Sequence, residues 1–196
     1  MAIDTKAISK IREITGAGIS DCKAALTEAG DDMDKAVEIL RKKGAIKAAK
    51  KLAEREAKQG VVESYIHANG KVGVLIQVHC ETDFVALNQE FKNLVHDLAM
   101  QIAGANPLYV KPEDVPEEVI AKEKEIYSEQ LKNEGKPENM IERIMTGKID
   151  KYFQEVCLLR QPFIKDDKII IEDLIKNYIA KLGEKIEVAR FCRYQI

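Results

Sequence analysis

The hydrophobic pattern of this chain changes period at Gly60, and this change constrains the fold more than any other feature. Before Gly60, apolar residues recur every three or four positions, which is typical of amphipathic helices. Runs 61–67 and 72–81 then alternate apolar and polar residues, and Asn69-Gly70 between them is a strong hairpin signal. Helical spacing returns later in the chain. We therefore predict an α+β fold, with N-terminal helices followed by a small antiparallel sheet that is packed by helices.

The remaining elements follow from the same periodicity. The expected helices cover 88–104, 116–159 with a break near 133–137, and 171–182, and a closing strand covers 186–194. The phase of this last strand is ambiguous, because regular alternation places the charged Arg190 on the same face as Val188 and Cys192. A β-bulge would move Arg190 off that face.

The chain is predicted to contain three segments of different character. The first reads as three short helices that end at the glycines at positions 16, 30 and 44, with Ser20 and Asp32 as N-cap candidates for the second and third. The predicted domains are a three-helix module at 1–44, a helical connector at 45–59 and an α+β core at 60–196. Since so small a bundle has little stability alone, we interpret it as a docking module. The basic connector is either a contact surface or simply a solvated helix.

Composition excludes several classes of function. The 196 residues include 31 Lys and Arg against 33 Asp and Glu, so a net charge of -2 disfavours direct nucleic-acid binding. The longest apolar runs are shorter than the roughly 20 residues that span a bilayer, and no secretory signal is visible. The four cysteines are far apart, and we interpret them as reduced, mostly buried thiols: Cys22, Cys80, Cys157 and Cys192. A cytoplasmic protein is expected.

Signals for enzymatic chemistry are weak. The three histidines are His67, His79 and His96. His79 and Cys80 are adjacent on a predicted strand, so their side chains point to opposite faces and do not chelate one ion. The sequence has no Gly-rich phosphate loop, nucleophile elbow or metal-ligand spacing. We therefore expect no catalytic residue, no metal site and no cofactor.

The segment 81–88 allows two interpretations. Thr82 or Asp83 can cap the following helix, and Phe84 can pack back on the core as a hydrophobic staple. Alternatively, an exposed acid beside an exposed aromatic ring forms a probe that enters a partner, since aromatic anchors often dominate interfaces. Capping is the commoner role at such junctions. The residues alone also allow an adaptor whose helical module binds peptides.

Two longer motifs resemble a known family. Residues 77–88, QVHCETDFVALN, and residues 11–26, IREITGAGISDCKAAL, are similar to the two signatures of the elongation factor Ts family. Weaker similarity follows in the same order along essentially the whole chain, at 98–103, 161–166 and 191–194. The chain departs from the family pattern at Gln77, His79 and Leu87, where Glu, Asn and a basic residue are more common. These departures put in doubt only the contacts that flank the Thr-Asp-Phe-Val core.

The resemblance implies a function by binding rather than catalysis. It implies a ubiquitin-associated-like N-terminal module, and binding to GDP-loaded elongation factor Tu that promotes GDP release by displacing magnesium, so that GTP rebinds. The turn of Thr82, Asp83, Phe84 and Val85 would enter the partner's GTPase domain near the magnesium ion. A second contact would be made by Arg12, Gly18, Ile19 and Lys23. We also expect a homodimer that completes the binding surface.

Overall fold

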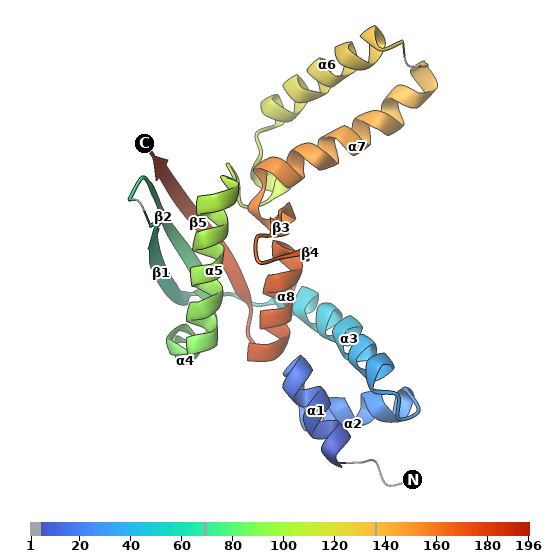
Figure 1. Ribbon diagram of the computed structural model, residues 1–196, viewed down its shortest axis with the longest axis vertical. Helices are drawn as coiled ribbons and strands as arrows, with labels where there is room; N and C mark the ends of the chain where they lie inside the picture. The colour runs from blue at the N-terminus through green and yellow to red at the C-terminus, as the bar shows by residue number, and fades with distance from the viewer. Residues whose placement is uncertain (1–4, 69, 136) are drawn as a thin grey trace. The chain divides into compact units, whose positions relative to one another are not determined.

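The computed structural model describes residues 5–68, 70–135 and 137–196. It is α+β, as predicted, with N-terminal helices followed by small antiparallel sheets that are packed by helices (Figure 1). The chain forms two compact units. In terms of described residues, unit 1 contains 5–62, 77–95 and 173–189, and unit 2 contains 63–76, 96–172 and 190–196 apart from residues 69 and 136.

The N-terminal helices of unit 1 are α1 (Thr5–Thr15), α2 (Ile19–Glu28) and α3 (Met33–Glu54). Each contacts the other two. They enclose a buried cluster that consists of Ile11, Cys22, Ala25, Leu26, Ala36 and Leu40. The predicted cap of the third helix is confirmed, because Asp32 Oδ1 accepts hydrogen bonds from the backbone N–H groups of Asp34 and Lys35, each at 3.1 Å.

Two predicted helix boundaries in this region are wrong. Helix α2 begins at Ile19 with Gly18 as its N-cap, so Ser20 lies inside the helix. Helix α3 does not end at Gly44 but continues through the alanine-rich segment to Glu54. A glycine inside a helix costs about 1 kcal/mol relative to alanine, but here its small size has a use. A Cβ atom at Gly44 would lie only 3.3 Å from Cβ of Ala180 in α8 (Ile171–Leu182).

The main sheet has the strand order β1-β2-β5. Its strands are β1 (Gln59–Ile66), β2 (Val72–Cys80) and β5 (Ile186–Gln195). The alternation predicted for 72–81 is confirmed, since Val74, Ile76, Val78 and Cys80 on one face of β2 are all buried. Gly60 has a φ of +147°, and a Cβ atom there would lie 2.1 Å from the carbonyl oxygen of Val78, so only glycine fits beside β2. Asn69 of the predicted hairpin turn lies outside the described residues.

Helices α4 (Asp83–Leu87) and α5 (Gln89–Ala105) follow the hairpin. The helical spacing predicted for 88–104 is confirmed, because Phe91, Leu94, Val95, Leu98 and Ile102 lie on one side of α5 and are fully buried. Within unit 2, α5 lies on one face of the sheet (Figure 1). His96 Nδ1 lies 2.9 Å from Glu63 Oε1 of β1, and the Arg193 guanidinium of β5 donates to the Ala103 carbonyl.

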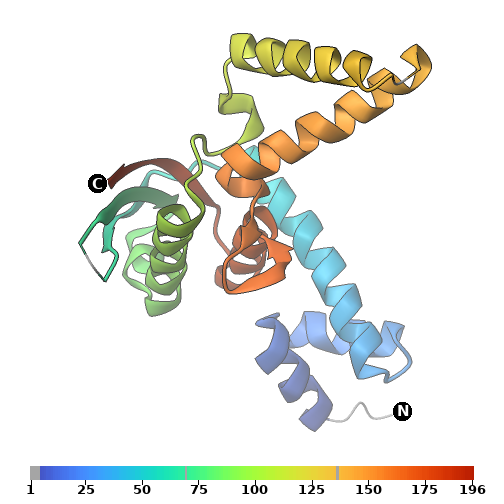
Figure 2. The ribbon, with the colours of Figure 1, turned by 45° about the horizontal axis from the view of Figure 1, so that its top comes forward.

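The middle of unit 2 is a helical hairpin of α6 (Glu117–Asn133) and α7 (Glu138–Val156), which pack against each other (Figure 2). The predicted break between them is confirmed, although Lys136 lies outside the described residues. Short 3-10 helices flank the hairpin at Pro112–Asp114 and Leu158–Arg160. A second antiparallel sheet is formed by β3 (Pro162–Phe163) and β4 (Asp166–Ile170).

The ambiguity in the last strand is resolved by its burial. Ile186 and Val188 are buried, Ala189 and Arg190 are both exposed, and Phe191 and Arg193 are half-buried. The alternation therefore shifts by one residue after Val188, so Arg190 does not lie on the buried face. Two consecutive exposed residues in a strand are what a bulge produces.

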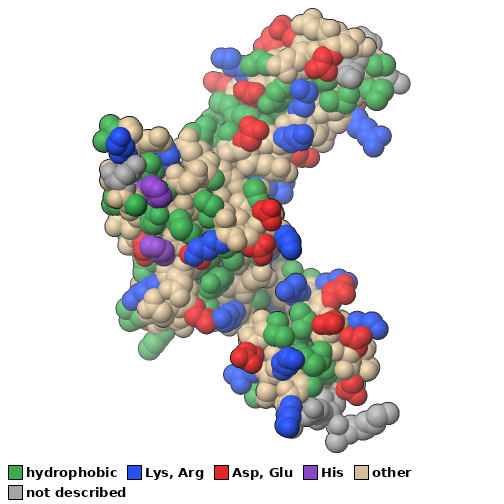
Figure 3. Space-filling model, viewed as in Figure 1, with side chains coloured by type: hydrophobic (Ala, Val, Ile, Leu, Met, Phe, Trp, Pro, Cys, Tyr) green, Lys and Arg blue, Asp and Glu red, His purple; other side chains and the backbone are tan. Residues whose placement is uncertain are grey.

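The surface is charged and mixed. Figure 3 shows Lys and Arg side chains interspersed with Asp and Glu over the face in view, in keeping with the net charge of -2. Among the residues that the structure describes, no helix is both long and apolar enough to cross a membrane.

Candidate partner-binding site

The predicted probe residues lie where β2 gives way to the short helix α4. Thr82 is the N-cap of this helix, and its Oγ1 accepts a hydrogen bond from the Val85 N–H at 3.4 Å. Phe84 is 83% exposed, so it is not a staple on the core, and Asp83 beside it is exposed as well. Ala86 is buried and anchors the helix. Capping and an exposed acid–aromatic pair therefore occur together in one turn.

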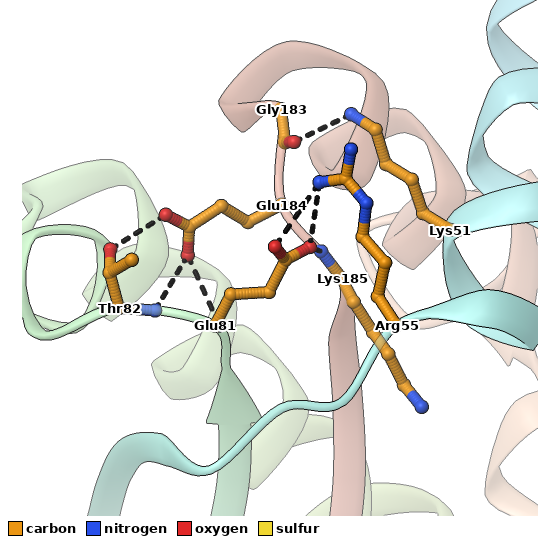
Figure 4. Close-up of polar contacts among 7 residues, drawn as sticks. All are labelled: Lys51, Arg55, Glu81, Thr82, Gly183, Glu184 and Lys185. Atoms are coloured by element: carbon orange, nitrogen blue, oxygen red, sulfur yellow. Dashed lines mark hydrogen bonds and ion pairs between the residues drawn. The ribbon is translucent and has the colours of Figure 1, made fainter.

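The base of the turn is held by the carboxylate of Glu184 (Figure 4). Glu184 Oε2 accepts hydrogen bonds from the backbone N–H of Glu81 at 3.1 Å and from that of Thr82 at 3.0 Å. The Thr82 hydroxyl donates to Glu184 Oε1 at 2.6 Å. Because its hydrogen goes to Glu184, the hydroxyl oxygen is left to accept from Val85. The orientation of Thr82 is fixed from both sides.

The side chain of Glu81 makes the reciprocal contact. Its Oε1 accepts from the backbone N–H of Lys185 at 2.6 Å, and Arg55 Nη1 donates to both carboxylate oxygens at 3.1 Å. Burial alone raises the pKa of the Glu81 carboxyl, but the hydrogen bonds from Lys185 and Arg55 outweigh it, and the pKa lies below its ordinary value. Next to this pair, Lys51 Nζ donates to the carbonyl oxygen of Gly183 at 2.6 Å.

These contacts come from three parts of unit 1: the end of α3, the β2–α4 junction, and the turn between α8 and β5. The turn between α8 and β5 begins at Gly183, whose φ of +82° is one that glycine adopts without strain. Its N–H donates to the Ile179 carbonyl and closes α8. The exposed probe therefore stands on a base in which the polar groups are paired.

Chemistry beyond binding finds little support in this region. Cys80 is buried, its thiol donates to the Thr82 carbonyl at 3.1 Å, and burial together with the nearby Glu184 charge raises the pKa of the thiol to about 11. A thiol with this pKa is protonated near neutral pH and is a poor nucleophile. Within the described ranges, no three His, Cys, Asp or Glu side chains lie close enough to hold a metal ion.

The other predicted contact residues lie on the N-terminal helices. Arg12 is exposed in the last turn of α1, and Gly18, which precedes α2, is exposed as well. Ile19 is 58% exposed and, together with Lys23, lies on one face of α2 at a spacing of four residues. These residues and the Thr82–Val85 turn belong to different elements of the same unit.

Sequence reasoning did not identify the residues that hold the turn: Lys51, Arg55, Glu184 and Lys185. Thr82 and Glu184 are separated by 102 residues, and one sequence gives no sign that they pair. The local signal nearest to Glu184 was the predicted end of the helix at 182, which the structure confirms.

Comparison with known proteins gives the family. The family model described as Elongation factor TS matches residues 3–196. The chain belongs to the elongation factor Ts family. Members of this family are nucleotide exchange factors of translation elongation and act by binding rather than as enzymes. The resemblance inferred from the two motifs is confirmed.

Relatives in this family match the chain over nearly its whole length. Elongation factor Ts of Moorella thermoacetica is 58% identical over 195 residues, which are 100% of this chain and 94% of the relative. That of Thermotoga petrophila is 58% identical over 196 residues, covering 100% and 97% of the two chains. The Carboxydothermus hydrogenoformans protein is 55% identical over 194 residues, covering 99% and 89%.

Proposed function

We propose that this chain binds elongation factor Tu in its GDP-bound state in the cytoplasm and accelerates GDP release, after which GTP rebinds. The observation that carries this proposal is the turn in which Phe84, 83% exposed, and the exposed Asp83 project from a fixed base. An aromatic ring in water beside a carboxylate, on a rigid support, suits insertion into a preformed pocket. A preorganised probe also loses less conformational entropy on binding.

Phe84 is the wedge in this proposal. Its ring is in water in the free chain and becomes buried in an apolar pocket of the partner's GTPase domain. Burying such a side chain contributes about 1.5–3 kcal/mol to binding. This energy is available only in the complex, where it can stabilise a partner conformation that holds nucleotide poorly.

Asp83 is the group that disturbs the magnesium ion. Magnesium at a nucleotide site has few direct protein ligands and keeps several waters, so its binding depends on the surrounding shell. A carboxylate brought close to this shell competes for its waters and side chains. When magnesium leaves, the charge of the diphosphate is uncompensated and GDP binds less tightly.

The N-terminal helices supply the second contact, through Arg12, Gly18, Ile19 and Lys23. We propose that these helices are a ubiquitin-associated-like module, an assignment supported by three helices around one small core. Segments 1–44, 45–59 and 60–196 remain our proposed module, connector and core, with α3 continuing from the first into the second. Linkage is reciprocal: the chain weakens nucleotide binding to the partner by the same factor by which nucleotide weakens binding of the chain.

We also propose a homodimer formed through the sheet face opposite α5. In unit 2, Ile66, Leu75 and Tyr194 are 64%, 49% and 74% exposed. In each strand, the neighbouring residues point toward α5 or the core. Because side chains alternate between the faces of a sheet, these three side chains lie on the opposite, open face. A second copy of the same sheet is the occupant that such a partly apolar face fits.

The direct test of this function is release of a fluorescent GDP analogue from elongation factor Tu, followed by stopped flow after mixing with excess unlabelled GDP. The chain should accelerate release in a concentration-dependent and saturable manner, and excess magnesium should oppose the effect. Release at the spontaneous rate at every concentration would exclude exchange. In that case, capture of many partners regardless of GDP would support the peptide-binding adaptor.

A further inference from the structure

We infer that Glu184 is a positioning residue for nucleotide exchange: its carboxylate fixes the backbone from which Asp83 and Phe84 project. The inference rests on the proposed function, because it takes the turn to be the part that enters the partner. Glu184 itself lies between α8 and β5. Its hydrogen bonds go to Glu81 and Thr82, at the base of the Thr82–Val85 turn, rather than to the side chains of Asp83 and Phe84.

The first argument is the number and kind of bonds that one carboxylate makes. Glu184 accepts from the N–H groups of Glu81 and Thr82 and from the Thr82 hydroxyl. The two backbone donors are the last ones before α4, so they define the direction in which the helix leaves the sheet. Hydrogen bonds to an ionised acceptor are shorter and stronger than bonds between neutral groups.

The second argument is that α4 has little else to hold it. It has only five residues, Asp83–Leu87, and helices much shorter than about 12 residues are marginal on their own. Among these five, Ala86 is the buried one, whereas Phe84 and Leu87 are 83% and 70% exposed. The direction of the turn therefore depends on its polar base more than on packing.

The third argument is that the contact is reciprocal. Glu184 binds the backbone of Glu81, and Glu81 binds the backbone of Lys185 (Figure 4). We call Glu81, Thr82, Glu184 and the backbone N–H of Lys185 the carboxylate clasp. Two carboxylates in one clasp repel each other, and Arg55 provides the compensating positive charge through Glu81. Two chain segments that are a hundred residues apart are thus fixed to each other at the point where the probe begins.

The clasp also reaches the N-terminal helices. Arg55 is the C-cap of α3, and Lys51 in the last turn of α3 binds the Gly183 carbonyl. The same helix contributes Ala36 and Leu40 to the core of the three-helix cluster. The clasp therefore joins the two contact regions of the proposed function within unit 1, and it can set the orientation of one while the other is bound.

The test compares GDP release with Glu184→Gln and with a matched control, Glu187→Gln. The substitution at Glu184 keeps the size of the side chain and one acceptor oxygen, but it removes the negative charge and replaces the second acceptor oxygen by an NH2 group, which only donates. Glu187 lies on β5. Its carboxylate is 2.9 Å from Lys185 Nζ, and this ion pair does not involve the Thr82–Val85 turn. Maximal release should fall by about tenfold with Glu184→Gln, since small misplacements of reacting groups are costly, while half-saturation changes little. Glu187→Gln should release GDP like the natural chain.

A double-mutant cycle separates positioning from general stability. In the Phe84→Ala background, Glu184→Gln should have a much smaller effect, because the ring that it positions is already absent. Thermal unfolding confirms that each variant is folded before its GDP release is compared. Wild-type maximal release by folded Glu184→Gln, or equal losses with and without Phe84, would overturn the inference. An inactive natural chain would instead overturn the proposed function.

Discussion

Phe84 leaves most of its ring in water, and such a ring contributes little to the stability of the free chain. The neighbouring Phe91 presents the opposite case, because its ring is fully buried in α5. The two residues are the same in chemistry and only seven positions apart. They therefore allow a test of whether Phe84 belongs to the core or to a contact surface.

We predict that Phe84→Ala changes the free energy of unfolding by less than about 0.5 kcal/mol, as is usual for exposed positions. Phe91→Ala should lower it by about 3–5 kcal/mol, because it leaves a cavity in the core. Urea denaturation followed by circular dichroism measures both. A loss of several kcal/mol with Phe84→Ala would show that this ring contributes to the core.

The cysteines, like the two phenylalanines, differ in their exposure to solvent. Cys80 and Cys157 are buried, and burial raises the pKa of each thiol to about 11, while Cys192 is exposed. Because the thiolate is the reactive form, we predict that one thiol reacts rapidly with Ellman's reagent at neutral pH in native protein diluted below the concentration at which it dimerises, and four in denaturant. Fast reaction of two or more native thiols would contradict the burial of the other cysteines.

At the scale of elements, the carboxylate clasp links stability to pH. The pKa of Glu81 in the folded chain lies below the ordinary glutamate value of 4.5. A group with a lowered folded pKa contributes its stabilisation above its unfolded pKa and loses it as the pH falls through the folded pKa. Acidification from neutral pH should therefore weaken the clasp only below about pH 4.5.

We predict that the free energy of unfolding decreases more steeply with acid in the natural chain than in Glu81→Gln, over the interval just below pH 4.5. Glu81→Gln should itself be less stable at pH 7, because it loses the ion pair with Arg55. Parallel pH profiles of the two proteins from chemical denaturation would show that Glu81 does not carry this linkage.

The elements themselves could largely be predicted from periodicity. The core faces of β2 and α5, the Asp32 cap and the helix at 171–182 follow from local spacing, and the structure confirms them. Errors arose where tertiary contacts override a local signal. Gly44 resembles a helix end in sequence, but its small size serves a close approach to Ala180. The long helix begins at Gln89, close to its predicted start at 88, but the separate short helix α4 before it was not predicted.

The candidate site was predictable only in part, for the same reason. Thr82 and its neighbours could be found because one motif contains them. Their exposure could not be deduced, since a cap and a staple fit the same residues. Glu184 and Arg55 act on the turn through contacts between distant parts of the chain, and such contacts leave no trace in local spacing.

At the scale of the whole molecule, the open sheet face determines the proposed assembly. We predict that the chain sediments as a dimer at micromolar concentration and that Leu75→Glu shifts it to a monomer, because a charge on this face opposes its burial. Leu108→Glu is the matched control, since Leu108 is 62% exposed and lies outside the sheet. A natural chain that is monomeric throughout, or equal effects of the two variants, would exclude dimerisation through this face.

The central claim is that the Thr82–Val85 turn promotes GDP release. The most direct measurement is the maximal rate of GDP release from elongation factor Tu, by stopped flow, with the natural chain, Phe84→Ala and Leu108→Ala. Loss of a buried contact worth about 1.5–3 kcal/mol predicts a rate roughly ten- to a hundredfold lower with Phe84→Ala. Leu108→Ala, which also removes an exposed apolar side chain, should release GDP at the natural rate. An unchanged rate with folded Phe84→Ala would contradict the claim.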